Sequence, residues 1–177
     1  MASLLRNTFI AFPVQIGSGV AFTQISKETL GVAAGNFTQV AIPAGFTQIR
    51  VTILGKATAG TGIIKLVFNG DTGNNYFQQY LKATGATVTA VNPAATGAWT
   101  LADNYGAADL FQTVAFISNP TATIYRTGQA ISGSGSTPLN FSSNISWANT
   151  GLITTIDIST TTSTFTIGSQ LIVEGLK

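Results

Sequence analysis

A six-residue stretch, QIRVTI at residues 48–53, carries the clearest indication of the fold. Its apolar residues Ile49, Val51 and Ile53 alternate with polar ones, so an extended chain would present one apolar and one polar face. β-Branched residues make up most of the stretch, and such residues favour strands over helices. The pattern therefore predicts a strand that is buried on one face only.

Alternation of the same kind continues along the chain. Ile64, Leu66 and Phe68 alternate with Lys65 and Val67. Further runs are anchored by Val114, Phe116, Ile124, Ile156, Ile158, Leu171 and Val173. Roughly eight to ten short strands of this type predict an all-β, single-domain, two-sheet antiparallel sandwich of jelly-roll-like form. We place this sandwich at residues 26–177.

Glycine, proline and asparagine separate the runs and predict turns. Asn69-Gly70 and Asp71-Thr72-Gly73 directly follow a strand and suit a tight hairpin, because glycine tolerates positive φ. Other breaks fall at Pro43-Ala44-Gly45, Asn92-Pro93, Asn119-Pro120 and Thr137-Pro138. Residues 131–137 are rich in glycine and serine, which predicts an exposed loop. Only residues 102–110 and 27–34 have patterns that allow a short helical turn.

The first 25 residues are less regular than the rest of the chain. They are strongly apolar at Leu4, Leu5, Phe9, Ile10, Phe12, Val14 and Ile16. Two interpretations stay open: a first strand of the sandwich, or an arm that leaves the domain and docks on a neighbouring subunit. For the arm, the expected docking residues are Leu4, Leu5, Phe9, Ile10 and Phe12.

Charged residues are scarce. They make up 8% of the chain, against roughly 25% in an ordinary soluble domain. A surface built from hydroxyl and amide side chains suits a protein that is covered by other proteins, although a monomer kept soluble by those groups is the alternative. The net charge is +2 and the eight cations are scattered singly, whereas nucleic-acid binding needs several cations on one face. We therefore expect no nucleic-acid partner.

Cysteine and histidine are both absent from the sequence. Their absence removes the disulfide framework, the thiolate metal site and the commonest general base. The N-terminus does not resemble a signal peptide, and no apolar run is long enough for a transmembrane helix. We expect no cofactor, no metal and no membrane partner.

The acidic residues form no catalytic motif. They are Glu28, Asp71, Asp103, Asp109, Asp157 and Glu174. A paired-carboxylate glycosidase needs two such groups facing each other across a cleft. Asp71 lies in a predicted turn, while Asp157 and Glu174 interrupt strands and are expected to face solvent. Neither a phosphate-binding loop nor a nucleophile elbow occurs in the sequence. We therefore expect that the protein is not an enzyme.

Two binding sites are possible alternatives. Asn69, Asp71, Asn74 and Asn75 form an oxygen-rich segment that could bind calcium, although a turn explains them better. The aromatic residues Tyr76, Phe77, Tyr80, Trp99 and Tyr105 could form a platform for a sugar ring, although aromatics of β proteins usually fill the core. Within that group, Trp99 and Tyr105 are the candidate glycan platform.

Two segments resemble parts of small β-sandwich structural proteins of tailed bacteriophages. The segment IIKLVFNGDTGNNY at residues 63–76 looks like a strand–turn–strand motif of that group. The ending FTIGSQLIVEG at residues 165–175 is similar to its closing hairpin, in which a Gly-Ser turn leads into the final strand. ITTIDI at residues 153–158 also suits that layout. The motifs are structural, so no functional residue is carried over.

The resemblance implies a virion protein, assembled in the host cytoplasm and attached to the particle. Our leading hypothesis is a capsid decoration (cement) protein that stabilises the shell through contacts with the major capsid protein or other virion subunits. A homo-oligomer, trimer or dimer, is expected, with strand-edge pairing as a second route to a neighbour. The rival hypotheses are a tail or fibre module that binds host glycans, and an enzyme that cleaves cell-surface polysaccharide.

Overall fold

The structure, a computed structural model, describes residues 21–58, 62–105, 110–119, 124–135 and 139–177. Twelve strands and no helix occur among these residues. The first six are β1 (Thr23–Thr29), β2 (Val40–Ala41), β3 (Gln48–Gly55), β4 (Gly62–Phe68), β5 (Tyr76–Thr84) and β6 (Thr87–Val91). The last six are β7 (Trp99–Tyr105), β8 (Phe111–Ser118), β9 (Arg126–Ser134), β10 (Leu139–Trp147), β11 (Thr155–Thr161) and β12 (Gln170–Leu176).

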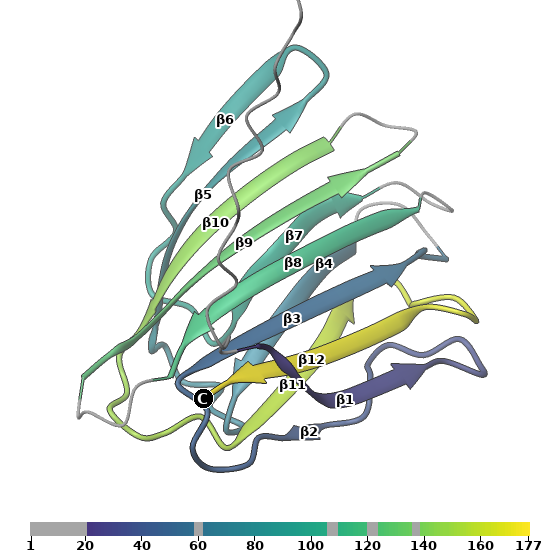
Figure 1. Cartoon of the computed structure of the whole chain (residues 1–177). Coiled ribbons are helices and arrows are strands. Elements are labelled where there is room, and N and C mark those ends of the chain that lie inside the picture. The colour runs from purple at the N-terminus through teal and green to yellow at the C-terminus, as the bar shows by residue number, and fades with distance from the viewer. Residues whose placement is uncertain (1–20, 59–61, 106–109, 120–123, 136–138) are drawn as a thin grey trace, which may run out of the picture.

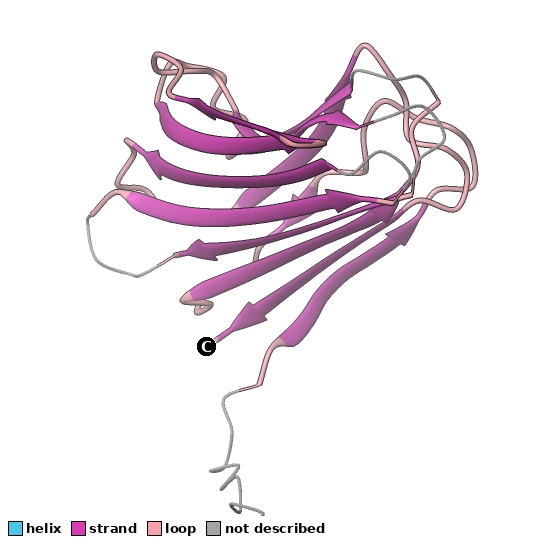
Figure 2. Cartoon of the chain, turned by 90° about the horizontal axis from the view of Figure 1, so that it is seen from above, coloured by secondary structure: helices cyan, strands magenta, loops and turns pink. Residues whose placement is uncertain are grey.

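The strands form two antiparallel sheets of unequal size. The large sheet has eight strands in the order β1-β12-β3-β8-β9-β10-β5-β6, and the small sheet has four in the order β2-β11-β4-β7. The small sheet lies behind the large one in Figure 1, and Figure 2 shows the same layers from above. The predicted all-β antiparallel sandwich is therefore confirmed. The chain passes repeatedly between the sheets, as in a jelly roll, but the division of strands is eight and four.

The stretch at residues 48–53 forms most of β3, near the middle of the large sheet. Ile49, Val51 and Ile53 are fully buried, whereas Arg50 and Thr52 point to the other face and remain partly exposed. Strand β3 pairs with β12 on one side and β8 on the other. The alternation thus predicted both the strand and the face that it buries.

Aromatic side chains fill one end of the core between the sheets. Phe68 lies 5.9 Å from Tyr76, 6.5 Å from Trp99 and 5.2 Å from Trp147, measured between ring centroids. All four residues are fully buried. Rings at such distances and in tilted or offset arrangements add to the stabilisation that burial alone provides. The cluster joins strands of both sheets, so it holds the two layers together.

The predicted hairpin after β4 does not form. Asn69 and Gly70 do make a tight turn with positive φ, closed by the bond from the Asp71 amide to the Phe68 carbonyl at 2.9 Å. However, β4 belongs to the small sheet and β5 to the large one. The Asn69 side chain accepts hydrogen bonds from the amides of Thr154 and Thr155, which ties the turn to β11 and directs the chain across the sandwich.

Three further expectations about local structure are corrected. Residues 27–29 lie in β1 and residues 102–105 in β7, where helical turns were expected; pairing with β12 and with β4 keeps these segments extended. Residues 131–134, expected in a loop, extend β9 because β8 and β10 pair with it on both sides. The described residues form twelve strands, against an expected eight to ten, because short β2 and exposed β6 lack a clear burial pattern.

Strand β1 begins at Thr23, so the last residues of the expected N-terminal arm, residues 23–25, lie in the large sheet. The expected docking residues Leu4, Leu5, Phe9, Ile10 and Phe12 lie outside the described residues. Across the described residues, the structure offers no helix that could cross a bilayer.

Candidate interaction surface

The large sheet has one face against the small sheet and one face turned outward, which we call the open face. Residues alternate between the two faces along β8, β9, β10 and β5. The strand register places Phe116 beside Gln129, Gln129 beside Asn144, and Asn144 beside Gln79. Gln129, Asn144 and Gln79 therefore form a row of neighbouring amide side chains, which we call the amide row.

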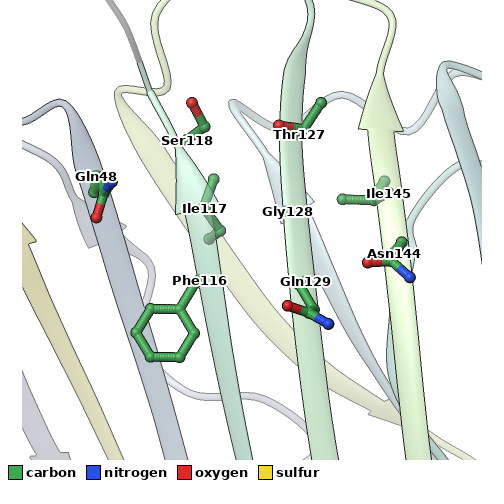
Figure 3. Close-up of a pocket in the computed structure, with 9 residues that line it drawn as sticks. All are labelled: Gln48, Phe116, Ile117, Ser118, Thr127, Gly128, Gln129, Asn144 and Ile145. Atoms are coloured by element: carbon green, nitrogen blue, oxygen red, sulfur yellow. The ribbon is translucent and has the colours of Figure 1, made fainter.

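The amide row borders two hollows of the open face. One, of about 600 Å³, is lined by Phe116, Gln129 and Asn144 among others, and Figure 3 shows these three side chains level with one another on β8, β9 and β10. The other, of about 410 Å³, is lined by Asn144, Gln79 and residues of β6. Asn144 lies in both, so the hollows adjoin. Within the described residues the three amides make no hydrogen bonds to other side chains or to backbone.

Large apolar side chains are exposed on the same face. Ile131 is 61% exposed, Leu81 is 53% exposed and Phe116 is 48% exposed. Phe77, at the start of β5, belongs to the same group. Isolated exposed apolar residues are normal on a protein surface, but several on one sheet face are typical of an interaction site.

Charge divides the open face into two parts. From β8 to β6, across five strands, no charged side chain points outward among the described residues. On β3 and β12, in contrast, Arg50 and Glu174 form an ion pair at 2.7 Å. Arg50 also lies over the ring of Phe22, 4.6 Å from its centroid, and Phe22 packs edge-on against Phe116 at 6.4 Å. Phe22, the residue before β1, therefore lies on the open face.

The outer face of the small sheet differs in character. It carries Lys65 on β4 and Asp157 on β11, and Asp157 accepts hydrogen bonds from the side chain of Gln39. At its margin Asp103 forms an ion pair with Lys82 at 3.1 Å. Charged groups are therefore spread over this face, as on an ordinary solvated surface.

Trp99 cannot serve as the predicted glycan platform. Trp99 is fully buried between the sheets, where its indole nitrogen donates to the Ser143 hydroxyl at 2.7 Å. Its ring packs against Gly128, at which an added Cβ would come within 2.8 Å of the ring. The side chain of Tyr105 lies outside the described residues. Trp99 therefore cannot stack on a sugar. The alternation of Trp99 and Leu101 around Thr100 was the sequence signal for this burial.

The oxygen-rich segment after β4 is a structural turn. The Asp71 carboxylate accepts hydrogen bonds from the side chains of Asn75 and Trp147 and from the Gly73 amide. Burial by itself raises the pKa of Asp71, but these three hydrogen bonds outweigh it and leave the pKa below its ordinary value. The described residues contain no group of three or more histidine, cysteine, aspartate or glutamate residues that could hold a metal ion.

Each acid in the described part of the chain has a structural partner. Glu28 accepts from the Thr38 amide at 2.8 Å, and Asp71 from Asn75 and Trp147. The other acids are Asp103, Asp157 and Glu174, bonded to Lys82, Gln39 and Arg50 respectively. Asp109 lies outside the described residues. The carboxylates are thus spread over the molecule, each fixed in a local bond.

Sequence reasoning missed the buried side chain of Arg126, at the start of β9. It donates hydrogen bonds to the backbone carbonyls of Ile124, Thr150 and Gly151. Burial lowers its pKa from the ordinary arginine value. The sequence around Arg126 does not indicate that its side chain is buried. Two of the three carbonyls that it binds, those of Thr150 and Gly151, belong to a loop that is distant in sequence.

Sequence reasoning also missed the exposure of the β5–β6 hairpin. Residues 87–90 of β6 are exposed on both faces, and Val88 is 68% exposed. In Figure 1 this hairpin extends at the top beyond the strands of the small sheet. Strand β6 is therefore the part of the large sheet that its own chain does not cover, whereas β5 begins with buried Tyr76.

Comparisons with known proteins give no family. No family model matches the chain, and no curated protein matches it. Among solved structures the chain is similar to a mutant of the alginate lyase Aly36B in complex with an alginate trisaccharide. The TM-score is 0.34 and the identity 12%, over 91% of this chain and 81% of that chain. A likeness at this TM-score carries no argument about activity or ligand.

Proposed function

We propose that the protein is a non-enzymatic structural subunit of a tailed-phage particle, and that it attaches by laying the open face of its large sheet against a neighbouring protein. The leading form of this proposal is a capsid decoration protein. One observation carries the docking face: across β8 to β6 the open face has no outward charge among the described residues, yet exposes Ile131, Leu81 and Phe116. Desolvating such a face costs less than desolvating the charged face opposite.

The chemistry of the face supports a protein partner. Burying the exposed apolar side chains gives affinity, and the amide row can pair with backbone groups of the partner. The core of an interface is typically depleted of charge, as this face is, and Phe77 and Phe116 add exposed aromatic rings. The partner would be the major capsid protein or another virion subunit. Many copies bound in this way would raise the cost of separating the shell subunits.

The proposal is tested by removing the protein from its particle. Particles that lack it should assemble, but should release their contents at a lower temperature or a milder osmotic shock. Equal robustness with and without the protein would rule out stabilisation as its role.

A matched pair of variants tests the docking face. Ile131→Lys places a charge in the middle of the open face and should abolish rebinding to particles that lack the protein. Val67→Lys places the same charge on the outer face of the small sheet, where Asp157 is its cross-strand neighbour, and should rebind normally. Normal rebinding by both variants would show that the open face is not the docking face.

A second function, binding of neutral host glycans by a tail or fibre module, is supported by the amide row beside Phe116. Amides donate and accept hydrogen bonds to sugar hydroxyls, and an exposed ring can stack on a sugar face. A glycan array is the direct test. Binding that is lost in Asn144→Ala and kept in Asn36→Ala, an amide far from the open face, would favour this function. No binding to any glycan would remove it.

A further inference from the structure

The two sheets have four edge strands, β1 and β6 in the large sheet and β2 and β7 in the small one. An edge strand presents unpaired backbone groups that can pair with another chain, and proteins usually protect such edges with charges, bulges, short strands or covering groups. We compare the four edges on this basis.

Two of the edges are protected by their own strands. Strand β1 has a register shift between Gln24 and Ser26 and carries Lys27 and Glu28. Strand β2 has only two residues. These are features that discourage pairing with another chain.

The edge of β7 is covered by side chains of the large sheet. The Thr100 amide donates to the Gln78 side chain at 2.9 Å. The Thr100 and Leu101 carbonyls accept hydrogen bonds from the hydroxyls of Ser143 and Ser132, at 3.0 and 2.6 Å. Three backbone groups at the start of β7 are therefore already bonded to the large sheet.

Strand β6 has none of these protections. Its sequence, TVTAV at residues 87–91, contains no charged residue and no proline, and its pairing with β5 continues without a register shift. Residues 87–90 are exposed on both faces. A five-residue edge with high β propensity and no charge is a site for strand addition.

The turn of the hairpin shows which backbone groups of β6 are free. Gly85, with φ of 57°, and Ala86 join the paired residues Thr84 and Thr87. In a two-residue hairpin the residues beside the turn bond to each other, and antiparallel pairing then alternates between bonded and non-bonded pairs. The N–H and C=O groups of Val88 and Ala90 therefore point away from β5, to the open edge.

We propose that β6 pairs antiparallel with β6 of a second copy of this chain, about a two-fold axis at Thr89, so that the large sheets of the two copies become continuous. In this register Val88 of each copy lies opposite Ala90 of the other, which joins the free backbone groups of both. Thr89 meets Thr89 on the axis. In a two-fold contact a strand pairs with an identical strand, so charged residues near the axis would face like charges. Strand β6 has no charged residue, so no such repulsion arises.

The contact is small, because it consists of one five-residue strand from each copy. Interfaces of this size are weak or transient. In a particle that holds many copies, the high local concentration would increase the fraction of copies paired through this contact. The inference does not rest on the proposed function, since the pairing is a property of the isolated chain.

Cysteine cross-linking tests the pairing and its register. The chain has no cysteine, so a single introduced thiol reports one position without ambiguity. Thr89→Cys places two thiols on the axis in a non-bonded pair, with Cα atoms about 4.5 Å apart, a distance that a disulfide spans. Thr87→Cys places them about 14 Å apart, because four residues then separate them along the strand direction. Under mild oxidation Thr89→Cys should form a covalent dimer and Thr87→Cys should remain monomeric. Absence of the Thr89→Cys dimer, or equal dimerisation of both variants, would overturn the proposal.

Sedimentation over a concentration series tests the contact without oxidation. The unmodified chain should shift from monomer to dimer as its concentration rises. Val88→Lys adds a charge to the edge and should weaken the dimer at least tenfold, whereas Val32→Lys, at a residue exposed to a similar degree (70% against 68%), should dimerise like the unmodified chain. A chain that stays monomeric at every concentration, or variants with equal effects, would contradict β6 pairing.

Discussion

Two parts of the same eight-stranded sheet differ sharply in how deeply their side chains are buried. Strands β3, β8 and β9 have the small sheet behind them and bury side chains such as Ile49, Ala115 and Ala130 in the core. The β5–β6 hairpin extends beyond the small sheet, and β6 is exposed on both faces. Strands β3, β8 and β9 are also paired on both sides, whereas β6 is an edge strand, so the two parts differ both in side-chain burial and in backbone pairing.

Because of this difference, the covered strands stabilise the fold, whereas the uncovered strand is available for contacts with other molecules. Burial of apolar side chains between two layers is the main source of folding free energy, so the covered strands hold the fold. Strand β6, which is exposed on both faces, contributes little to that free energy, and its residues are free to contact another molecule. Substitutions in the two parts should therefore have effects of very different size.

The largest effect is expected at Trp99, in the covered part. Trp99→Ala removes a fully buried ring that packs on Phe68 and Gly128, so the free energy of unfolding should fall by about 4 kcal/mol. Urea denaturation measures this loss. Trp99→Phe keeps part of the packing but loses the bond to Ser143, so it should cost less. A loss below about 1 kcal/mol for the alanine variant would contradict the burial of this side chain.

A smaller effect is expected at Arg126. Arg126→Met fills similar space but leaves the carbonyls of Ile124, Thr150 and Gly151 without this donor, so the free energy of unfolding should fall by about 2–3 kcal/mol. Thermal unfolding followed by circular dichroism provides the measurement. Unchanged stability would mean that these three hydrogen bonds are not essential to the loop that they hold.

Asp71 should show a moderate effect that depends on pH. The lowered pKa means that the carboxylate stabilises the fold above its ordinary pKa and loses that contribution as the pH falls through the lower, folded value. Asp71→Asn should therefore cost about 1 kcal/mol at neutral pH, and the difference from the unmodified chain should shrink below about pH 4. Urea denaturation at several pH values tests both statements. If the stability difference grew on acidification, the pKa of Asp71 in the folded chain would be raised rather than lowered, which would contradict this prediction.

The smallest effect is expected in the hairpin. Val88→Thr changes a residue that is exposed on β6, so the free energy of unfolding of the dilute chain should change by less than about 0.5 kcal/mol. The same urea measurement applies. A loss comparable with that of Trp99→Ala would show that β6 is covered within its own chain, and would remove the contrast between the two parts of the sheet.

The sequence predicted the parts of the fold that depend on alternation. Ile49, Val51 and Ile53 on β3 and Leu171 and Val173 on β12 are buried as their spacing indicates. The register and the division into sheets could not be predicted in this way, because alternation does not identify a strand's partner. Asn69-Gly70 illustrates this limit, since the turn is present but the strands that flank it lie in different sheets.

The candidate surface was harder to predict than the fold. The Trp99 platform was wrong because aromatic residues serve equally well in cores and in binding sites, and only the position relative to the second sheet decides between them. The amide row joins Gln79, Gln129 and Asn144, which are far apart in sequence and become neighbours only through the strand register. The exposure of β6 depends on where the small sheet ends, which no local pattern encodes.

Hydrogen exchange in strand β6 tests most directly whether this uncovered part of the sheet is a contact surface. The measurement compares residues 87–91 in the dilute free chain with the same residues in assembled particles, and takes the covered strand β3 as the internal reference. Exchange in β6 should be fast in the free chain and strongly slowed on assembly, while β3 stays slow in both. Equally fast exchange of β6 in both states would contradict the claim that neighbouring subunits cover it.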